Sequence, residues 1–210
     1  WAFYTCTMCY RHPFERRIGM DPAGVDAAGR LFVHGASEMP QWAPGVRARP
    51  QDGNDAGLLP LTQARRCSAS SWSPGRTPSY AIDGSLRTWW QATDGDAVPW
   101  IETDLESVFI VSAARICWAE PNLNYDGGVT PGPMKYRIEG RAETDAPWTV
   151  LLDRTGNEAD LLIDYRTFPS REVRFARLLV TGGPRGMSIG VADFSLFGRG
   201  HFPPPGQYGK

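Results

Sequence analysis

The stretch AIDGSLRTWW, residues 81–90, combines an acidic turn with two adjacent tryptophans. The carboxylate of Asp83 can accept hydrogen bonds from the backbone N–H groups of its own turn, or it can supply oxygen to a hard cation. Neighbouring side chains of a strand point to opposite faces, so only one of Trp89 and Trp90 can enter a core. We expect one indole to pack in the core and the other to cover the turn.

A calcium site at this turn would add hydroxyl and backbone oxygens to the carboxylate of Asp83, and a second carboxylate from the end of the chain. Calcium accepts about six to eight oxygens of this mixed kind. The predicted ligands are Asp83, Ser85, Thr88 and Asp193. The alternative is a metal-free turn. Zinc is not expected, because Cys6 and Cys9 form a CxxC that no second CxxC follows.

The composition excludes several classes of protein. The chain has 210 residues and a formal net charge of −1, without the basic cluster of a nucleic-acid-binding protein or a polybasic membrane-binding run. No apolar run reaches about 18 residues, so no membrane insertion is expected. The 23 glycines and 18 prolines favour short strands joined by turns. A start at Trp1 rather than Met suggests a piece of a longer or processed protein.

The sequence pattern divides the chain into regions. Residues 1–45 contain strand-like runs around a turn-forming DPAGVDAAG, residues 46–64 form a Pro- and Gly-rich linker, and residues 200–210 form a tail. Residues 65–199 contain strand-type runs bounded by turn residues. The expected strands are 100–105, 113–119, 135–142, 148–153, 174–182 and 191–198. This spacing predicts an all-β antiparallel sandwich or jelly roll.

Residues 65–199 resemble the coagulation factor 5/8 type C (discoidin) domain, and within it the carbohydrate-binding modules of family 32. The resemblance rests on the order of SASSW (68–72), AIDGSLRTWW (81–90), WIETDL (100–105), ICW (116–118), YRIEG (136–140) and VADFSLFG (191–198). It implies an eight-stranded, galactose-binding-domain-like jelly roll in an extracellular or secreted protein. It also implies a structural calcium at the turn, although that branch has Asp or Asn in place of Ser85 and Glu in place of Asp193.

The segment FERRIGMDPAGVDAAGRLFV, residues 14–33, resembles the last blade of a five-bladed propeller of glycoside hydrolase family 43. This second resemblance implies that the chain is the non-catalytic C-terminal part of a bacterial glycoside hydrolase with an upstream catalytic domain. The alternative is an ordinary strand–turn–strand.

Ligand contacts in such a sandwich are expected from loops at one end, here residues 70–80, 119–133 and 182–188. A sugar requires an aromatic face and a few planar hydrogen-bonding groups. The candidate ligand-binding residues are Trp72, Arg76, Asn122, Asn124, Tyr125 and Arg185. Trp72 has the alternative of filling the core, and the two arginines that of being solvated charges. Because no histidine occurs between positions 35 and 200, the galactose-binding histidine frequent in the family has no counterpart.

The sequence therefore predicts a non-catalytic carbohydrate-binding module that binds a glycan or polysaccharide. The alternatives are a structural spacer without a ligand and a discoidin-type adhesion domain for protein or lipid. A glycosidase would need two carboxyl groups placed across one bond. The available pairs, Asp104 or Glu102 with Glu139, lie in predicted strands and are expected to be structural.

Overall fold

The computed structural model describes residues 1–6, 17–35, 37, 39–46 and 55–200. The chain forms two compact units, residues 1–59 and 60–210. Cys9, the middle of the predicted linker and the predicted tail after Gly200 lie outside the described residues.

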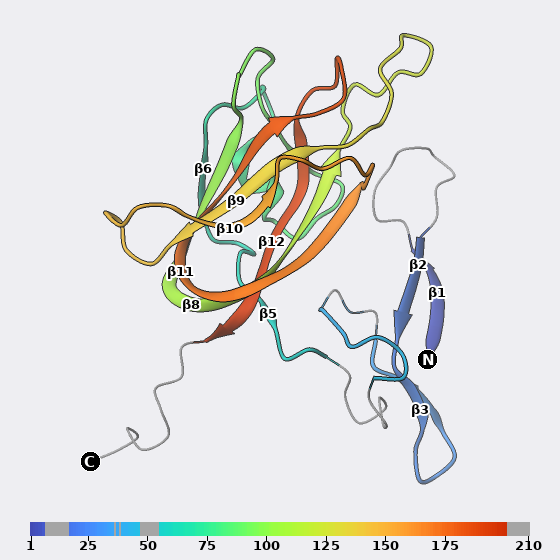
Figure 1. Cartoon of the computed structure of the whole chain (residues 1–210). Helices are drawn as coiled ribbons and strands as arrows, with labels where there is room; N and C mark the ends of the chain where they lie inside the picture. Colours follow the sequence, from blue (N-terminus) through green and yellow to red (C-terminus); the bar gives the residue numbers. More distant parts are fainter. Residues whose placement is uncertain (7–16, 36, 38, 47–54, 201–210) are drawn as a thin grey trace, which may run out of the picture. The chain divides into compact units, whose positions relative to one another are not determined.

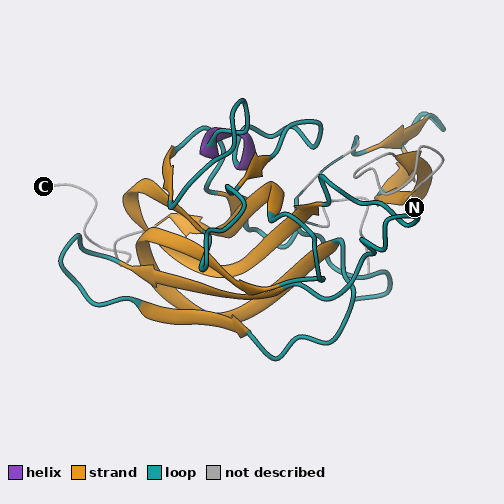
Figure 2. Ribbon diagram, turned by 90° about the horizontal axis from the view of Figure 1, so that it is seen from above, coloured by secondary structure: helices purple, strands orange, loops and turns teal. Residues whose placement is uncertain are grey.

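The second unit is an antiparallel β-sheet that folds over itself into two layers (Figures 1 and 2). Its elements are β5 (Leu59–Pro60), β6 (Arg66–Ala69), the short 3-10 helix η2 (Pro78–Ala81), β7 (Trp90–Gln91), β8 (Trp100–Ala119), β9 (Lys135–Arg141), β10 (Thr149–Arg154), β11 (Ile163–Gly182) and β12 (Gly190–Gly200). The predicted all-β class and jelly-roll sandwich are confirmed.

Two long bent strands connect the layers. The first part of β8 pairs with β6 and with the last part of β11, whereas its second part pairs with β12 and with the first part of β11. The pairing of β8 with β11 is irregular between Asp104 and Phe109, and within this stretch Glu106 has a φ of 68°, which is unusual for a residue other than glycine. The sequence predicted separate strands at 100–105 and 113–119, and the structure joins them into one strand.

The core lies between the layers. Along the first part of β8, Ile101, Thr103 and Leu105 are buried and alternate with half-buried charged residues, as expected for a strand with one face on a core. Trp118 from the other layer packs against Tyr136, with ring centroids 5.4 Å apart. Full burial of each large apolar side chain contributes roughly 1.5–3 kcal/mol.

The two adjacent tryptophans separate as expected. Trp90 is fully buried in β7, and its indole N–H donates a hydrogen bond to the carbonyl of Ser71 at 2.8 Å. Trp89 is half-buried, and its indole N–H donates to Oε1 of Gln91 at 3.2 Å. Trp90 thereby anchors the 70–80 loop to the core.

The first unit contains two hairpins, β1 (Ala2–Cys6) with β2 (Arg17–Asp21), and β3 (Ala23–Val25) with β4 (Leu31–Val33). The strand β3 lies in a stretch that the sequence predicted as a turn. The carboxylate of Asp26 accepts hydrogen bonds from the backbone N–H groups of Ala28 and Arg30, which closes the tight turn of the second hairpin. The buried carboxylate of Asp21 accepts hydrogen bonds from Tyr4, Ser37 and Gln41.

Candidate functional site

Hydrogen bonds cross-link two of the predicted ligand loops. The side chain of Asn122 donates to the carbonyl of Gly186 at 2.7 Å and accepts from the backbone N–H of Ser188 at 2.8 Å. The hydroxyl of Ser188 in turn donates to Asp94 at 3.0 Å, which adds a fourth loop that sequence reasoning missed. Asn122 therefore has a structural task, because it fixes the 119–133 loop to the 182–188 loop.

The 70–80 loop is fixed to residues 91–96. The hydroxyls of Ser70 and Ser71 both donate to Oδ2 of Asp96 at 2.6 Å. Burial would raise the pKa of Asp96, but the hydrogen bonds from these serines outweigh that effect and the pKa is lowered. The sequence TDGD, residues 93–96, is a turn signal that could have indicated this support.

Two aromatic side chains at the loop end are open to solvent. Trp72 is 50% exposed, which excludes the alternative in which it fills the core, and Tyr125 is 60% exposed. Tyr125 lies at the tip of a small hairpin in which Asn124 and Val129 exchange backbone hydrogen bonds. The side chain of Asn124 accepts from the N–H of Gly127 and so fixes the same tip.

The two candidate arginines have different surroundings. The guanidinium of Arg76 lies 3.3 Å from the centre of the Trp89 ring, so the alternative of a simple solvated charge is wrong for Arg76. Arg76 covers the indole that is not in the core. Arg185 is exposed in the 182–188 loop.

Three of the four predicted calcium ligands come together at the turn. Asp83 accepts from the backbone N–H of Ser85 at 2.8 Å and from the hydroxyl of Thr88 at 2.6 Å, and that hydroxyl also lies 3.2 Å from the carbonyl oxygen of Ser85. These oxygens are of the kinds that calcium binds. The oxygens of this turn could supply part of a calcium coordination shell. The same groups also hydrogen-bond to one another without a cation.

Asp193, the fourth predicted ligand, has other contacts. Its carboxylate accepts from Nε of Arg115 at 3.0 Å and from the hydroxyl of Ser195 at 2.8 Å. A carboxylate held by a guanidinium has less negative charge to offer a cation. Within the described residues, no group of three or more His, Cys, Asp and Glu side chains could hold a metal ion.

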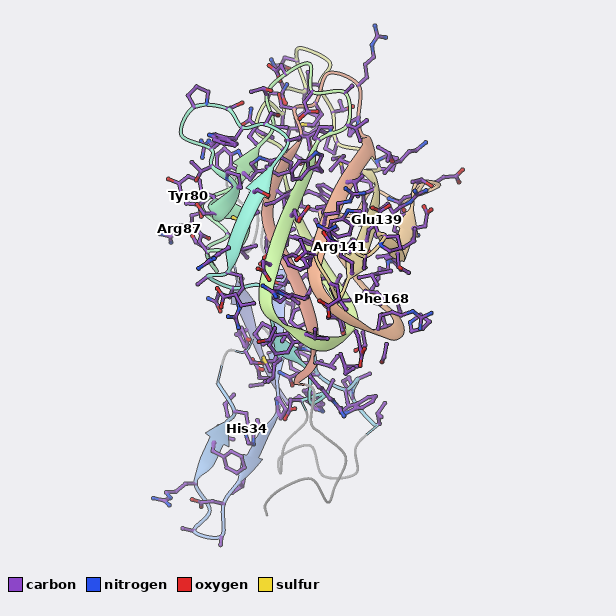
Figure 3. All side chains as sticks on the ribbon, turned by 90° about the vertical axis from the view of Figure 1, so that its left-hand side faces the viewer. His34, Tyr80, Arg87, Glu139, Arg141 and Phe168 are labelled. Carbon is purple, nitrogen blue, oxygen red and sulfur yellow. The ribbon has the colours of Figure 1, made fainter. Side chains whose placement is uncertain are left out.

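The outer face of β9, β11 and the first part of β8 carries ion pairs. Figure 3 labels Glu139 and Arg141, which both belong to β9. The carboxylate of Glu139 accepts a hydrogen bond from Nε of Arg177 and lies 2.7 Å from Nη2 of the same side chain. The carboxylate of Asp104 accepts a hydrogen bond from Nε of Arg174. Trp148 lies beside them with the guanidinium carbons of Arg141 and Arg177 each 4.3 Å from its ring centre. The predicted structural role of these strand carboxylates agrees with their ion pairs.

The two-layered antiparallel jelly roll agrees with the fold of a discoidin-type domain. The chain belongs to the F5/8 type C domain family, whose model matches residues 63–192. A comparison with curated protein sequences gave no match. No helix among the described residues is long and apolar enough to cross a membrane.

Solved structures of similar fold include carbohydrate-binding modules. Chitosan-binding module 1 of a chitosanase/glucanase from Paenibacillus sp. IK-5 is 24% identical, with a TM-score of 0.56 over 67% of this chain and 99% of that chain. The family 32 module of NanJ from Clostridium perfringens, solved with galactose, is 21% identical, with a TM-score of 0.55 over 67% and 98%. A third, CpGH89CBM32-4 from Clostridium perfringens with GlcNAc-alpha-1,4-galactose, is 17% identical, with a TM-score of 0.56 over 68% and 96%.

Proposed function

We propose that this protein is a carbohydrate-binding module and that its glycan binds at the loop end. The observation that carries the proposal is the exposed side chain of Trp72 on a loop that hydrogen bonds hold in place. At the neighbouring Ser71, the carbonyl accepts from the indole N–H of Trp90, and the hydroxyl donates to Asp96. A rigid aromatic face loses little entropy when a sugar ring stacks on it. Tyr125 provides a second aromatic face, and Arg185 provides a planar donor.

The affinity should be weak. A shallow site contacts one or two sugar rings, and each hydrogen bond to the sugar replaces one to water, so its net gain is only about 1 kcal/mol. We expect a dissociation constant on the order of 0.1–1 mM, which corresponds to about −4 to −5.5 kcal/mol.

Calorimetric titration of the chain with chitooligosaccharides and galactosides tests the proposal, since solved modules of this fold are described with chitotriose and galactose. The variants Trp72→Ala and Tyr125→Ala should weaken binding at least about tenfold while the melting temperature stays nearly unchanged. Trp148→Ala is the matched control, because its indole is already covered by two arginines. If no glycan in a broad panel binds at millimolar concentration, the module is a structural spacer.

We further propose that the module belongs to a glycoside hydrolase and that the first unit packs against the catalytic domain. The hairpins support this part of the proposal, because Phe3 and Ile18 in one and Leu31 and Val25 in the other are 63–80% exposed. Apolar side chains gathered on one small unit mark an interaction surface. Backbone amides of β1 and β2 should exchange fast in this chain and slowly in the longer polypeptide. Equally slow exchange in both would show that the hairpins need no partner.

A further inference from the structure

A cavity of about 210 Å³ lies where β9 ends and the chain turns toward β10. It is lined by Gly140, Arg141, Ala142, Ala146, Pro147, Thr149, Leu151, Arg171 and Glu172. The strand β9 starts next to the 119–133 loop and has seven residues. At about 3.4 Å per residue, the cavity is therefore roughly 20 Å from the loop end, and it is a separate site.

Arg141 has donors that the protein does not satisfy. Its side chain is only 19% exposed, its Nε–H is buried, and this Nε–H has no hydrogen-bond partner among the described residues. The nearest carboxylate, on Glu102, is 3.8 Å from Nη2, which is beyond a good hydrogen bond. Burial raises the pKa of Glu102, and the positive charges of Arg141 and Arg177 offset this rise only in part.

Other arginines of the same face are paired closely, and they provide the comparison. Arg137 lies 3.0 Å from Asp153, and Arg177 lies 2.7 Å from Glu139. The stack of Arg141 on Trp148 holds the guanidinium plane without using its N–H groups. Arg141 is therefore held in place beside a cavity that it lines, and the carboxylate of Glu102 is too far from its Nη2 for a good hydrogen bond.

The residues that line the cavity indicate which kind of ligand would fit it. A guanidinium can bind a carboxylate end-on through two parallel hydrogen bonds from Nη1 and Nη2, and this contact does not need the buried Nε–H of Arg141. The small apolar side chains of Ala142, Ala146 and Pro147 can contact the C–H face of a sugar ring, and Thr149 and Glu172 can bond its hydroxyls. The volume is below the roughly 300–1,000 Å³ of pockets for drug-sized ligands, so it suits one ring.

We propose that this cavity is a second binding site and that it takes a single hexuronate residue of an acidic glycan, with its carboxylate on Arg141. The proposal does not depend on the loop-end site, since the two sites share no residue.

The test is a titration of the chain with glucuronate and galacturonate, with glucose, galactose and inorganic sulfate as further arms. Both uronates should bind more tightly than their neutral parent sugars. Arg141→Lys keeps the charge but removes the two-pronged edge, and Ala146→Phe fills the cavity without changing any charge. Each variant should weaken uronate binding about tenfold or more. Arg137→Lys on the same strand is the matched control and should leave binding unchanged, as should Trp72→Ala.

Each result decides the proposal. Uronate binding that survives both Arg141→Lys and Ala146→Phe, in variants whose melting shows that they are folded, would overturn it. Binding of sulfate with no binding of either uronate would identify an anion site without sugar recognition and would also overturn it. Loss of neutral-sugar binding in Trp72→Ala together with intact uronate binding would show that the two sites are independent.

Discussion

Trp72 and Trp148 lie in two regions of the same sandwich and have opposite surroundings. Trp72 is half exposed on a loop that is held by the hydrogen bond from Ser71 to Asp96. Among the described residues, no guanidinium stacks on its ring. Trp148 has two guanidinium groups against its ring, and these belong to a face of paired charges. The difference explains why we propose Trp72 and not Trp148 as the sugar platform, since stacking needs an aromatic face that is left open.

The rigidity of the two regions also has different sources. At the loop end, neutral side chains such as Asn122 and Ser188 bond to backbone groups and to Asp94. On the outer face of β9 and β11, ion pairs and cation–π stacks hold the side chains. Salt should therefore affect the stability of the outer face more than the geometry of the loop end.

The largest expected effect separates Trp90 from Trp72. Trp90→Ala should reduce the free energy of unfolding by about 3–5 kcal/mol, because it removes a fully buried indole. Trp72→Ala should reduce it by less than about 1 kcal/mol, because half of the side chain is already in water. Urea unfolding of both variants measures this difference. Equal losses would contradict the assignment of Trp72 as an exposed side chain that adds little to stability.

The next largest expected effect is the gain in stability from calcium binding, which stays a prediction. A cation bound at the turn of Asp83, Ser85 and Thr88 would add about 2.7 kcal/mol of stability when free calcium is about 100 times its dissociation constant. Added calcium should raise the melting temperature of the chelator-treated protein, and Asp83→Ala should abolish the rise. Asp126→Ala, which removes an exposed loop carboxylate, is the control. A melting curve indifferent to calcium would leave a metal-free turn.

Trp148→Ala should show a smaller effect on stability and none on binding at the loop end. Each cation–π stack at a partly exposed site contributes about 0.5–1 kcal/mol, so the loss of two stacks should cost about 1–2 kcal/mol. Thermal unfolding and glycan titration of one preparation measure both quantities. Weaker glycan binding in this variant would extend the binding surface to the outer face.

The smallest effect is a pH dependence on the outer face. The hydrogen bonds from Arg174 lower the pKa of Asp104 in the folded protein. The unfolded state therefore binds the proton more readily, and the stability from this pair is fully present above the ordinary pKa of about 3.9. It is lost as the pH falls through the lower folded pKa. Asp104→Asn should flatten that part of the stability profile, and an unchanged slope would contradict the assignment.

The sequence predicted the parts of the fold that follow from local pattern. Alternation of apolar and polar residues located β9, β10 and β12 nearly to their ends, and the parity of a strand showed that one of Trp89 and Trp90 is buried. Pattern could not show that 100–105 and 113–119 form one strand, because the irregular stretch around Glu106 depends on backbone geometry.

The sequence predicted where the candidate site lies better than it predicted the contacts within the site. The loops were identified from turn residues. The loop-fixing hydrogen bonds of Asn122 and the stacking of Arg76 on Trp89 depend on partners that only the folded chain brings close. Asn122 bonds to Gly186, 64 residues away, and Asp193 bonds to Arg115, 78 residues away. Pairs at such distances leave no signal in one sequence.

The most direct test of the central claim is an NMR titration of the 15N-labelled chain with a glycan that binds, in which the backbone and indole N–H signals are followed. We predict that the largest shifts occur at the indole N–H of Trp72 and at amides of residues 70–76, 122–129 and 184–188. The indole signal of Trp148 should stay in place with a neutral glycan. Shifts confined to β9, β11 and Trp148, with an unmoved Trp72 signal, would contradict a glycan site at the loop end.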